Sequence, residues 1–257
     1  MAGEGSTRSQ YPWRLDGRIA LVTGASSGLG ARFARVLHDA GAHVVATARR
    51  ADRLGELTAQ SHDRFEIMAG DITDAEHRKA VVERLEALGG LHVLVNNAGV
   101  CDDGPIEEQT LDELLRVVDV NLISVLDVCR LAAPLLLAKP GASVINVASL
   151  YGLVASLAPM AAYNATKGAL ISLTRQLAVQ WGGRGVRVNA LAPGYFPTEL
   201  TGFLTDPELT GSIREQTLLA RAPELHEIDG PLLFLATEAS SYMTGQVLVV
   251  DGGWTAH

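Results

Sequence analysis

Short apolar runs rich in β-branched residues alternate with segments of helical periodicity along nearly the whole chain. The apolar runs predict strands near residues 18–23, 43–48, 64–68, 91–95, 143–148, 186–191 and 246–250. The helical segments fall near residues 28–40, 50–60, 74–88, 109–137, 161–181 and 225–236. Strands that are apolar throughout are covered on both faces. The alternation therefore predicts an α/β fold: a doubly wound, mostly seven-stranded parallel sheet with helices on both faces.

A chain of 257 residues is within the range of a single α/β domain. No internal repeat, low-complexity linker or break in composition divides it, so we expect one domain over residues 14–257 after a loose polar extension at residues 1–13. The segment 194–224 breaks the alternation and carries Pro and Gly at its edges. A long insertion on the carboxyl side of a parallel sheet is where a substrate lid would lie.

Composition excludes several classes of function. A formal net charge of −8 argues against general nucleic-acid binding. The longest apolar runs are short and interrupted by polar residues, so we expect neither a membrane helix nor a membrane partner. Cys101 and Cys129 stand in dissimilar contexts without metal-ligand spacing. They predict no metal site and a reducing, cytoplasmic location.

A glycine-rich turn follows the first predicted strand and opens the first predicted helix, with the sequence Thr23-Gly24-Ala25-Ser26-Ser27-Gly28-Leu29-Gly30. Glycines let the backbone turn tightly and let a pyrophosphate approach, and the helix terminus adds N–H groups and a positive dipole end. Many strand-to-helix turns carry glycine for geometry alone. Because this one lies in the first βαβ unit, it predicts dinucleotide binding and a single-domain Rossmann fold.

Tyr163 and Lys167 stand four residues apart in a predicted helix, so their side chains share one face. A phenol normally titrates near pH 10, and a neighbouring ammonium favours the phenolate and lowers the phenol pKa. Such a pair predicts a tuned proton donor and acceptor. Ser149, at the end of an apolar run, adds a hydroxyl for a carbonyl oxygen. A single pair at this spacing is more often a solvated or packing pair.

Further motifs surround these residues in a fixed order. They are Asn96-Asn97-Ala98-Gly99, Asn121, Ser149, Tyr163-x-x-x-Lys167, Pro193-Gly194 and Asp251-Gly252-Gly253. With the glycine spacing T-G-x-x-x-G-x-G, the chain from about Leu15 to Trp254 resembles the classical short-chain dehydrogenase/reductase family. The resemblance implies an oxidoreductase that transfers a hydride between a nicotinamide and a secondary alcohol or ketone.

The resemblance also implies catalytic roles. Tyr163 would be the general acid in reduction and the base in oxidation, and Lys167 would lower its pKa and hold the nicotinamide ribose. Ser149 would orient the substrate oxygen. Asn121 would interrupt its helix and position a water that links the lysine to solvent, although a polar residue that caps a kink would look the same.

Cofactor contacts are implied in the same way. The loop residues Gly24, Ser26, Ser27, Gly28, Leu29 and Gly30 would hold the pyrophosphate. Asp71 and Ile72 would bind the adenine, and Asn97, Ala98 and Gly99 would support the adenosine side. Pro193, Gly194 and Thr198 would cover the nicotinamide, with Thr198 reaching its carboxamide.

The second predicted strand ends Ala48-Arg49-Arg50, without the carboxylate that reads a ribose 2′-hydroxyl. A guanidinium grips a phosphate through two hydrogen bonds, so Arg49 favours NADP(H). The alternative is that these arginines are solvated residues at a helix start. Ser27 stands where many NADP-preferring relatives place a second basic residue, so NAD(H) stays possible.

The substrate is predicted only as a small-molecule alcohol or ketone. Tyr151, Met160, Tyr195 and Phe196 are candidate wall residues, and they suit a sugar or gluconate-type polyol, a 3-oxoacyl thioester or a hydrophobic ketone about equally. A cofactor-binding scaffold or sensor without catalysis is the alternative function. The helices predicted at 109–137 and 161–181 are apolar on more than one face, and the family usually pairs them, so we expect a homotetramer.

Overall fold

The computed structural model describes residues 13–58, 63–102, 104–199, 201 and 207–256. Within these residues one parallel sheet runs through the molecule, in the order β3-β2-β1-β4-β5-β6-β7. Its strands are β1 (Ile19–Thr23), β2 (His43–Ala48), β3 (Phe65–Ala69), β4 (Val93–Asn96), β5 (Ser143–Val147), β6 (Arg187–Pro193) and β7 (Val247–Val250). All seven predicted strands are present, each within two residues of its predicted bounds. The N-terminal extension proposed at 1–13 lies almost wholly outside the described residues.

Helices follow the strands in alternation. They are α1 (Gly28–Asp39), α2 (Ala51–Thr58), α3 (Ala75–Ala87), α4 (Leu111–Val118), α5 (Ser124–Leu137), α6 (Ala161–Trp181), α7 (Pro207–Gln216) and α8 (Asp229–Ala236). The helix predicted over 109–137 is divided by a π-helical turn at Asp119–Ile123, which leaves α4 and α5 on either side. Helix α7 was not predicted, and it lies inside the proposed lid segment.

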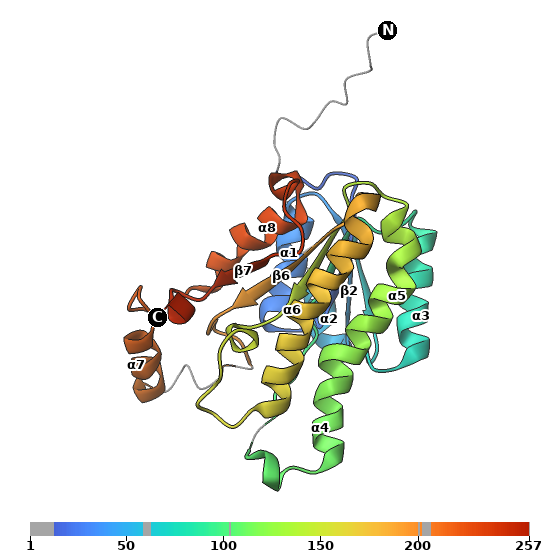
Figure 1. The fold of residues 1–257 in the computed structure, drawn as a ribbon. Helices are drawn as coiled ribbons and strands as arrows, with labels where there is room; N and C mark the ends of the chain where they lie inside the picture. Colours follow the sequence, from blue (N-terminus) through green and yellow to red (C-terminus); the bar gives the residue numbers. More distant parts are fainter. Residues whose placement is uncertain (1–12, 59–62, 103, 200, 202–206, 257) are drawn as a thin grey trace.

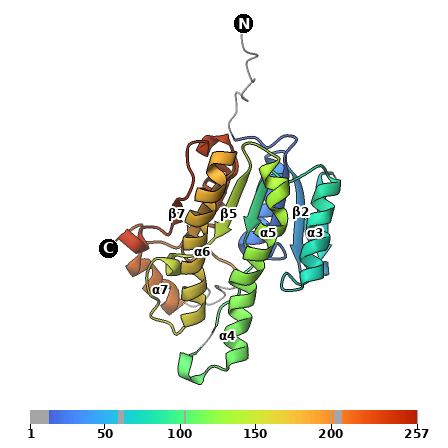
Figure 2. The same ribbon diagram turned by 45° about the vertical axis from the view of Figure 1, so that its right-hand side comes forward.

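The helices form two layers, one on each face of the sheet (Figures 1 and 2). Residues of α1, α2 and α8 share one buried core with Ala20 and Val22 of β1. Residues of α3, α5 and α6 share the other core with Leu21. Successive strand side chains point to opposite faces, so one apolar strand supplies both cores. The predicted doubly wound Rossmann fold is confirmed.

Strands β1 and β4 are neighbours at the centre of the sheet, and the strand order reverses between them. Loops that leave the carboxyl ends of two such strands open a crevice, which is where ligands bind in folds of this kind. The two loops are joined here, because Thr23 Oγ1 accepts hydrogen bonds from the backbone N–H groups of Asn97 and Ala98, both at 3.0 Å. The end of β4 is therefore fixed to the start of the glycine loop.

The continuous helical stretch Leu111–Leu137 has 27 residues, and an 18-residue part of it has a mean hydropathy of 1.8, so by length and composition alone it could cross a membrane. The sequence analysis predicted a helix over residues 109–137 but expected no membrane helix. Core helices of globular proteins meet the same criterion, and Val128 and Cys129 of this stretch pack under the sheet. Arg78 of α3 also pairs with Asp127 at 2.6 Å. These contacts favour the interpretation of α5 as a sheet-covering helix.

Candidate active site

The glycine loop has a backbone that only glycine adopts easily. Gly24 and Gly28 have φ values of +68° and +52°, in the left-handed region. A Cβ on Gly24 would lie 2.7 Å from Ala98 Cα, and a Cβ on Gly30 would collide with the carbonyl oxygen of Gly24. The loop is therefore packed against the end of β4, with no room for a side chain at Gly24 or Gly30.

The amino terminus of α1 fits an anionic cofactor group. Ser27 is the N-cap residue, but among the described residues its side chain makes no hydrogen bond to the helix N–H groups. The first turn of α1 also carries no acidic residue. A helix end of this kind offers N–H groups and a positive dipole end to a phosphate. The residues present therefore fit the pyrophosphate of a dinucleotide.

A guanidinium lies on the same loop, and it belongs to Arg50. Its Nη2 donates to Ser27 Oγ at 2.6 Å and its Nε donates to Ser26 Oγ at 3.3 Å. Its Nη1 pairs with Glu199 Oε2 at 2.8 Å. The sequence analysis noted that position 27 has no basic residue, and Arg50, just after the end of β2, places a positive charge beside Ser27. Arg49, the residue singled out for the 2′-phosphate, is exposed. Hydrogen bonds from Thr73, with a smaller contribution from the charge of Arg49, lower the pKa of Asp71.

The segment after β6 lies on the glycine loop. A Cβ on Gly28 would lie 3.0 Å from Thr198 Cβ, and a Cβ on Gly194 would lie 2.8 Å from Asp251 Cα. Thr198 N donates to Thr201 Oγ1 at 2.8 Å, which closes a turn around the threonine. Two predicted cofactor elements, the glycine loop and Thr198, are therefore in contact. Residues 200 and 202–206 of the predicted lid lie outside the described residues.

The end of β4 connects the loop to the candidate catalytic residues. Asn97 Nδ2 donates to the carbonyl oxygens of Thr23 at 2.9 Å and Gly24 at 3.3 Å. A Cβ on Gly99 would lie 3.3 Å from Lys167 Nζ and 3.5 Å from Asn121 Oδ1. Gly99, which is one of the predicted cofactor-binding residues, therefore lies next to the Lys167 ammonium.

The predicted adenine-binding residues lie just after β3. Asp71 Oδ1 accepts a hydrogen bond from Thr73 N at 2.9 Å, and Ile72 packs at the edge of the core that includes α3.

Tyr163, Lys167 and Ser149 are buried together at the carboxyl edge of the sheet. They are 9%, 4% and 7% exposed, so all three lie beneath the surface. Lys167 Nζ lies 5.5 Å from the centre of the Tyr163 ring and donates to the carbonyl oxygen of Val147 at 2.8 Å. Ser149 Oγ accepts from Tyr151 N at 3.1 Å, and a hydrogen bond of Ser149 favours the charged form of Tyr163. The predicted trio is thus assembled from β5 and α6.

The pKa values in this trio differ from the sequence-based expectation. Burial, with a smaller contribution from Cys101, raises the pKa of Tyr163 to about 12. Burial also lowers the pKa of Lys167 to about 8. The prediction of a lowered phenol pKa is wrong for this structure, because burial disfavours the charged form of both groups. The tyrosine is therefore a protonated phenol at neutral pH.

Asn121 lies in the π-helical turn and is fully buried. Its Oδ1 accepts from Val100 N at 2.8 Å, and its Nδ2 donates to Val100 O at 2.9 Å and Thr166 Oγ1 at 3.1 Å. The helix interruption predicted at this residue is confirmed. The amide of Asn121 ties the segment after β4 to α6, and its role toward a water stays a prediction.

Two of the four candidate substrate residues meet each other. The hydroxyls of Tyr151 and Tyr195 are hydrogen-bonded, and their rings lie edge to face with centres 6.0 Å apart. Trp254 adds a third ring 5.2 Å from Tyr195. Burial raises the pKa of Tyr195, so its hydroxyl stays protonated. Met160 immediately precedes α6, whereas Phe196 is 3% exposed and packs into the core that includes α1.

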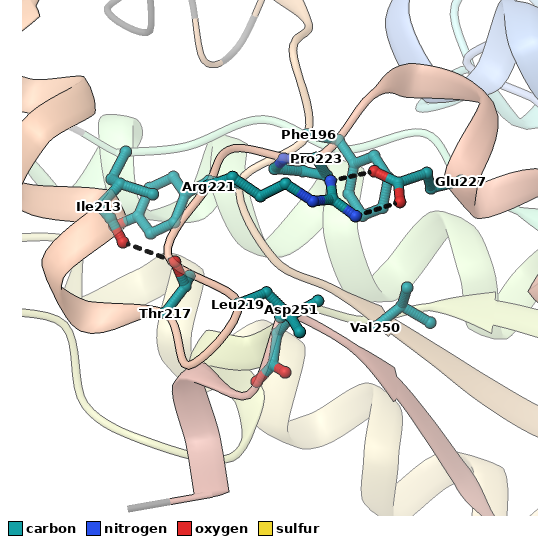
Figure 3. Close-up of a pocket in the computed structure, with 11 residues that line it drawn as sticks. Phe196, Ile213, Thr217, Leu219, Arg221, Pro223, Glu227, Val250 and Asp251 are labelled. Atoms are coloured by element: carbon teal, nitrogen blue, oxygen red, sulfur yellow. Dashed lines mark hydrogen bonds and ion pairs between the residues drawn. The ribbon is translucent and has the colours of Figure 1, made fainter.

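A cavity lined in part by Tyr195 lies between α7 and β7 (Figure 3). Apolar side chains such as Ile213, Leu219 and Val250 line it, and Arg221 crosses it to pair with Glu227. This pair lowers the pKa of Glu227 to about 2. Tyr195 lines the cavity and is also hydrogen-bonded to Tyr151.

Four residues of the site were missed or underrated by sequence reasoning: Arg50, Asp102, Glu199 and Trp254. Glu199 carried no signal, because its partner Arg50 is far away in sequence. Asp102, three residues after Gly99 of the Asn-Asn-Ala-Gly motif, accepts hydrogen bonds from the first turn of α6. An acidic residue close behind that motif was the available signal. Trp254 follows the Asp-Gly-Gly motif, which could have suggested a place near the site.

Comparison with known proteins places this geometry in context. A family model described as enoyl-(acyl carrier protein) reductase matches residues 24–255. The chain is 38% identical over 249 residues to galactitol 2-dehydrogenase (L-tagatose-forming) of Cereibacter sphaeroides, covering 95% of this chain and 97% of that protein. It is also 38% identical over 245 residues to 3-alpha-(or 20-beta)-hydroxysteroid dehydrogenase of Mycobacterium bovis, covering 95% and 91%.

Solved structures agree with these similarities. The gluconate 5-dehydrogenase of Burkholderia cenocepacia J2315, in complex with NADP and tartrate, superposes with a TM-score of 0.89 at 33% sequence identity. The match covers 96% of this chain and 98% of that one. The likeness extends over the whole sheet and both helical layers.

Proposed function

This chain belongs to the short-chain dehydrogenase/reductase family, and from that premise we propose that Tyr163, Lys167 and Ser149 carry out proton transfer in an NADP(H)-dependent oxidoreductase of sugar-type secondary alcohols. The class is established by the relatives, which are dehydrogenases acting on CH–OH groups. The observation that carries the proposal is the burial of this trio, with Lys167 next to Gly99 in the segment whose Asn97 and Ala98 are hydrogen-bonded to Thr23.

The proposed chemistry divides between cofactor and chain. A bound nicotinamide supplies or accepts the hydride. Ser149 Oγ binds the substrate oxygen, and the Tyr163 phenol, protonated at neutral pH, donates a proton to that oxygen during reduction. Oxidation requires the phenolate, so its rate should increase toward alkaline pH. Lys167, anchored on Val147, holds its ammonium between the tyrosine and the ribose side of the site.

The preference for NADP(H) is supported by charge. Arg50 contacts the hydroxyls of Ser26 and Ser27 at the glycine loop, and Arg49 follows Ala48 at the end of β2. The strand β2 ends in Ala48, so its last residue offers no carboxylate that would bind the ribose 2′-hydroxyl of NAD. Solved relatives bind NADP, among them the gluconate 5-dehydrogenase described above and a 2-deoxy-D-gluconate 3-dehydrogenase from Agrobacterium tumefaciens.

A polyol or sugar acid is the substrate class that we favour. The paired hydroxyls of Tyr151 and Tyr195 can exchange their mutual hydrogen bond for bonds to substrate hydroxyls. The named activities on galactitol and gluconate agree with this choice. A hydrophobic ketone is the second candidate, because Leu153, Val154 and Leu157 are exposed close behind Ser149 in the sequence. The hydroxysteroid dehydrogenase relative has an activity of that kind.

We further propose a homotetramer that pairs α4 and α5 with the same helices of a second copy. Leu111, Leu115 and Leu126 are 68%, 51% and 40% exposed on these helices. Exposed leucines on adjacent turns form the apolar surface expected of a subunit contact. A Leu115→Glu/Leu126→Glu variant should elute as a smaller species in chromatography with light scattering, and a monomeric wild type would contradict the proposal.

The experiment that tests the function combines binding with a substrate screen. NADPH and NADH are titrated against the purified protein by fluorescence, and galactitol, gluconate and a steroid alcohol are then offered with the oxidised form of the tighter cofactor. Tight NADPH binding with turnover of a polyol supports the proposal. Turnover of the steroid alone supports the hydrophobic candidate. Binding without turnover of any alcohol or ketone would favour a scaffold or sensor.

A further inference from the structure

The helix that carries Tyr163 begins without a cap of its own. Helix α6 starts at Ala161. The side chain of its N-cap residue, Met160, makes no hydrogen bond to the N–H groups of the first turn. The first turn also contains no acidic residue. Uncapped N–H groups at a buried helix end are unfavourable, and caps normally come from Ser, Thr, Asp or Asn at the N-cap position. Tyr163 is the third residue of this helix.

Asp102 supplies the missing cap from another part of the chain. Its Oδ1 accepts from the backbone N–H of Tyr163 at 2.8 Å, and its Oδ2 accepts from that of Ala162 at 3.0 Å. The residue is 6% exposed. A carboxylate that accepts two N–H bonds at the positive end of a helix makes charge-assisted, short and directional contacts.

The segment that carries Asp102 is held on both sides. Upstream, Ala98 N donates to Thr23 Oγ1, and Val100 is hydrogen-bonded through both its N–H and its C=O to Asn121. Downstream, Gly104 N donates to Pro159 O at 3.3 Å. These hydrogen bonds therefore fix the position of the Asp102 carboxylate relative to the end of β4, which lies next to the cofactor loop.

We propose that Asp102 is a positioning residue for Tyr163, which fixes the first turn of α6 relative to the cofactor side of the site. The proposal rests on the proposed role of Tyr163 as the proton donor. Without the two hydrogen bonds from Ala162 N and Tyr163 N to Asp102, the first turn of α6 can unwind. The Tyr163 phenol then moves, because the Tyr163 backbone is part of that turn. Misplacement of a catalytic group by about 1 Å can lower turnover about 100-fold.

A matched control separates positioning from stability. Asp74 is also an Asp cap, since its side chain accepts from Glu76 N at 3.0 Å at the start of α3, a helix that carries none of the candidate catalytic residues. Asp102→Ala and Asp74→Ala both remove one capping carboxylate. Asp102→Asn keeps one of the two acceptor oxygens and serves as the conservative rescue.

The first readout needs no substrate. The chain has 5 tyrosines, so protein labelled with 3-fluorotyrosine gives few fluorine NMR signals, and the signal of Tyr163 is identified by its loss in Tyr163→Phe. Asp102→Ala should shift or broaden this signal and increase hydrogen exchange at the amides of residues 162 and 163 at least 10-fold. Asp102→Asn should give intermediate values, and Asp74→Ala should change neither.

The second readout is turnover of the substrate found in the screen, measured well below both melting temperatures. Asp102→Ala should lower kcat about 10- to 100-fold while the NADPH Kd stays within about threefold. An unchanged fluorine signal, or a loss of kcat equal to that of Asp74→Ala, would overturn the proposal. If Asp102→Ala does not fold, Asp102→Asn is judged by the same criteria. Retained turnover in Tyr163→Phe would refute the function and leave the fluorine and exchange results as the test of the cap.

Discussion

Arg50 and Glu199 form an ion pair, with 2.8 Å between Nη1 and Oε2, that joins the segment after β6 to the segment after β2. The same guanidinium donates to Ser27 Oγ, so a carboxylate and a hydroxyl share one cation at the start of α1. An anionic cofactor group arriving there would compete with Glu199 for Arg50. The pair is half-exposed, so its own contribution to stability is expected to be small.

Arg50→Ala should therefore weaken NADPH binding about 10- to 100-fold, because a charge-assisted hydrogen bond contributes about 1.5–3 kcal/mol. NADH binding should change much less, since it lacks the 2′-phosphate. Arg53→Ala is the control, as Arg53 Nη2 lies 3.9 Å from Glu199 Oε1, while among the described residues the hydrogen bonds of a guanidinium to Ser26 and Ser27 come from Arg50. Fluorescence titration with both cofactors measures the effect. Equal losses for NADPH and NADH would instead assign Arg50 to the architecture of the loop.

Gly30→Ala should destabilise the protein by about 1–3 kcal/mol, the usual cost of inserting atoms into a packed site. The added Cβ would collide with Gly24 O and lie 2.5 Å from Asn97 Nδ2, so the loop must move and NADPH binding should fall. Gly55→Ala is the matched control in α2, because nothing lies within 4 Å of its Cβ position. That change should stabilise by about 0.5–1 kcal/mol. Urea unfolding of both variants tests the pair, and equal effects would contradict it.

The bounds of strands and most helices could be predicted because each depends on local periodicity. Helix α7 could not, since Pro207, Thr210 and Gly211 give its sequence a weak helical signal. The π-helical turn was foreseen only as an interruption at Asn121, which the family resemblance implied without giving its geometry.

The motif residues of the site could also be predicted, but their partners could not. Asp102 lies 61 residues from Tyr163, and Glu199 lies on another segment from Arg50, so only the fold brings each pair together. The pKa of Tyr163 was predicted in the wrong direction because spacing gives the neighbour of a phenol and says nothing about its burial. Burial outweighed the expected effect of Lys167.

His92 should make stability depend on pH below neutrality. Its Nδ1 accepts from Ile19 N at 3.0 Å, and burial lowers its pKa to about 4. The unfolded chain takes up a proton near pH 6.5 while the folded chain does not, so stability falls as pH drops from about 6.5 to about 4. The loss attributable to His92 should be about 1–2 kcal/mol by pH 5.

Asn at position 92 can offer Oδ1 to the same N–H group and does not titrate, so His92→Asn should remove that part of the pH dependence. Urea unfolding of both proteins at about pH 7.5 and about pH 5 gives the comparison. The difference between wild type and variant isolates the histidine from the carboxylates that also titrate. Parallel losses in the two proteins would show that His92 is not responsible.

The most direct test of the proposed function is Tyr163→Phe, which removes one hydroxyl from a buried ring and keeps the packing. NADPH binding should stay within a few fold, because the glycine loop and arginines are unchanged. Turnover should fall by about 10²–10⁴, the usual contribution of a positioned proton donor. Measuring kcat and the NADPH Kd on the same preparation decides the question. Turnover close to that of the wild type would contradict the assignment of Tyr163 as the proton donor.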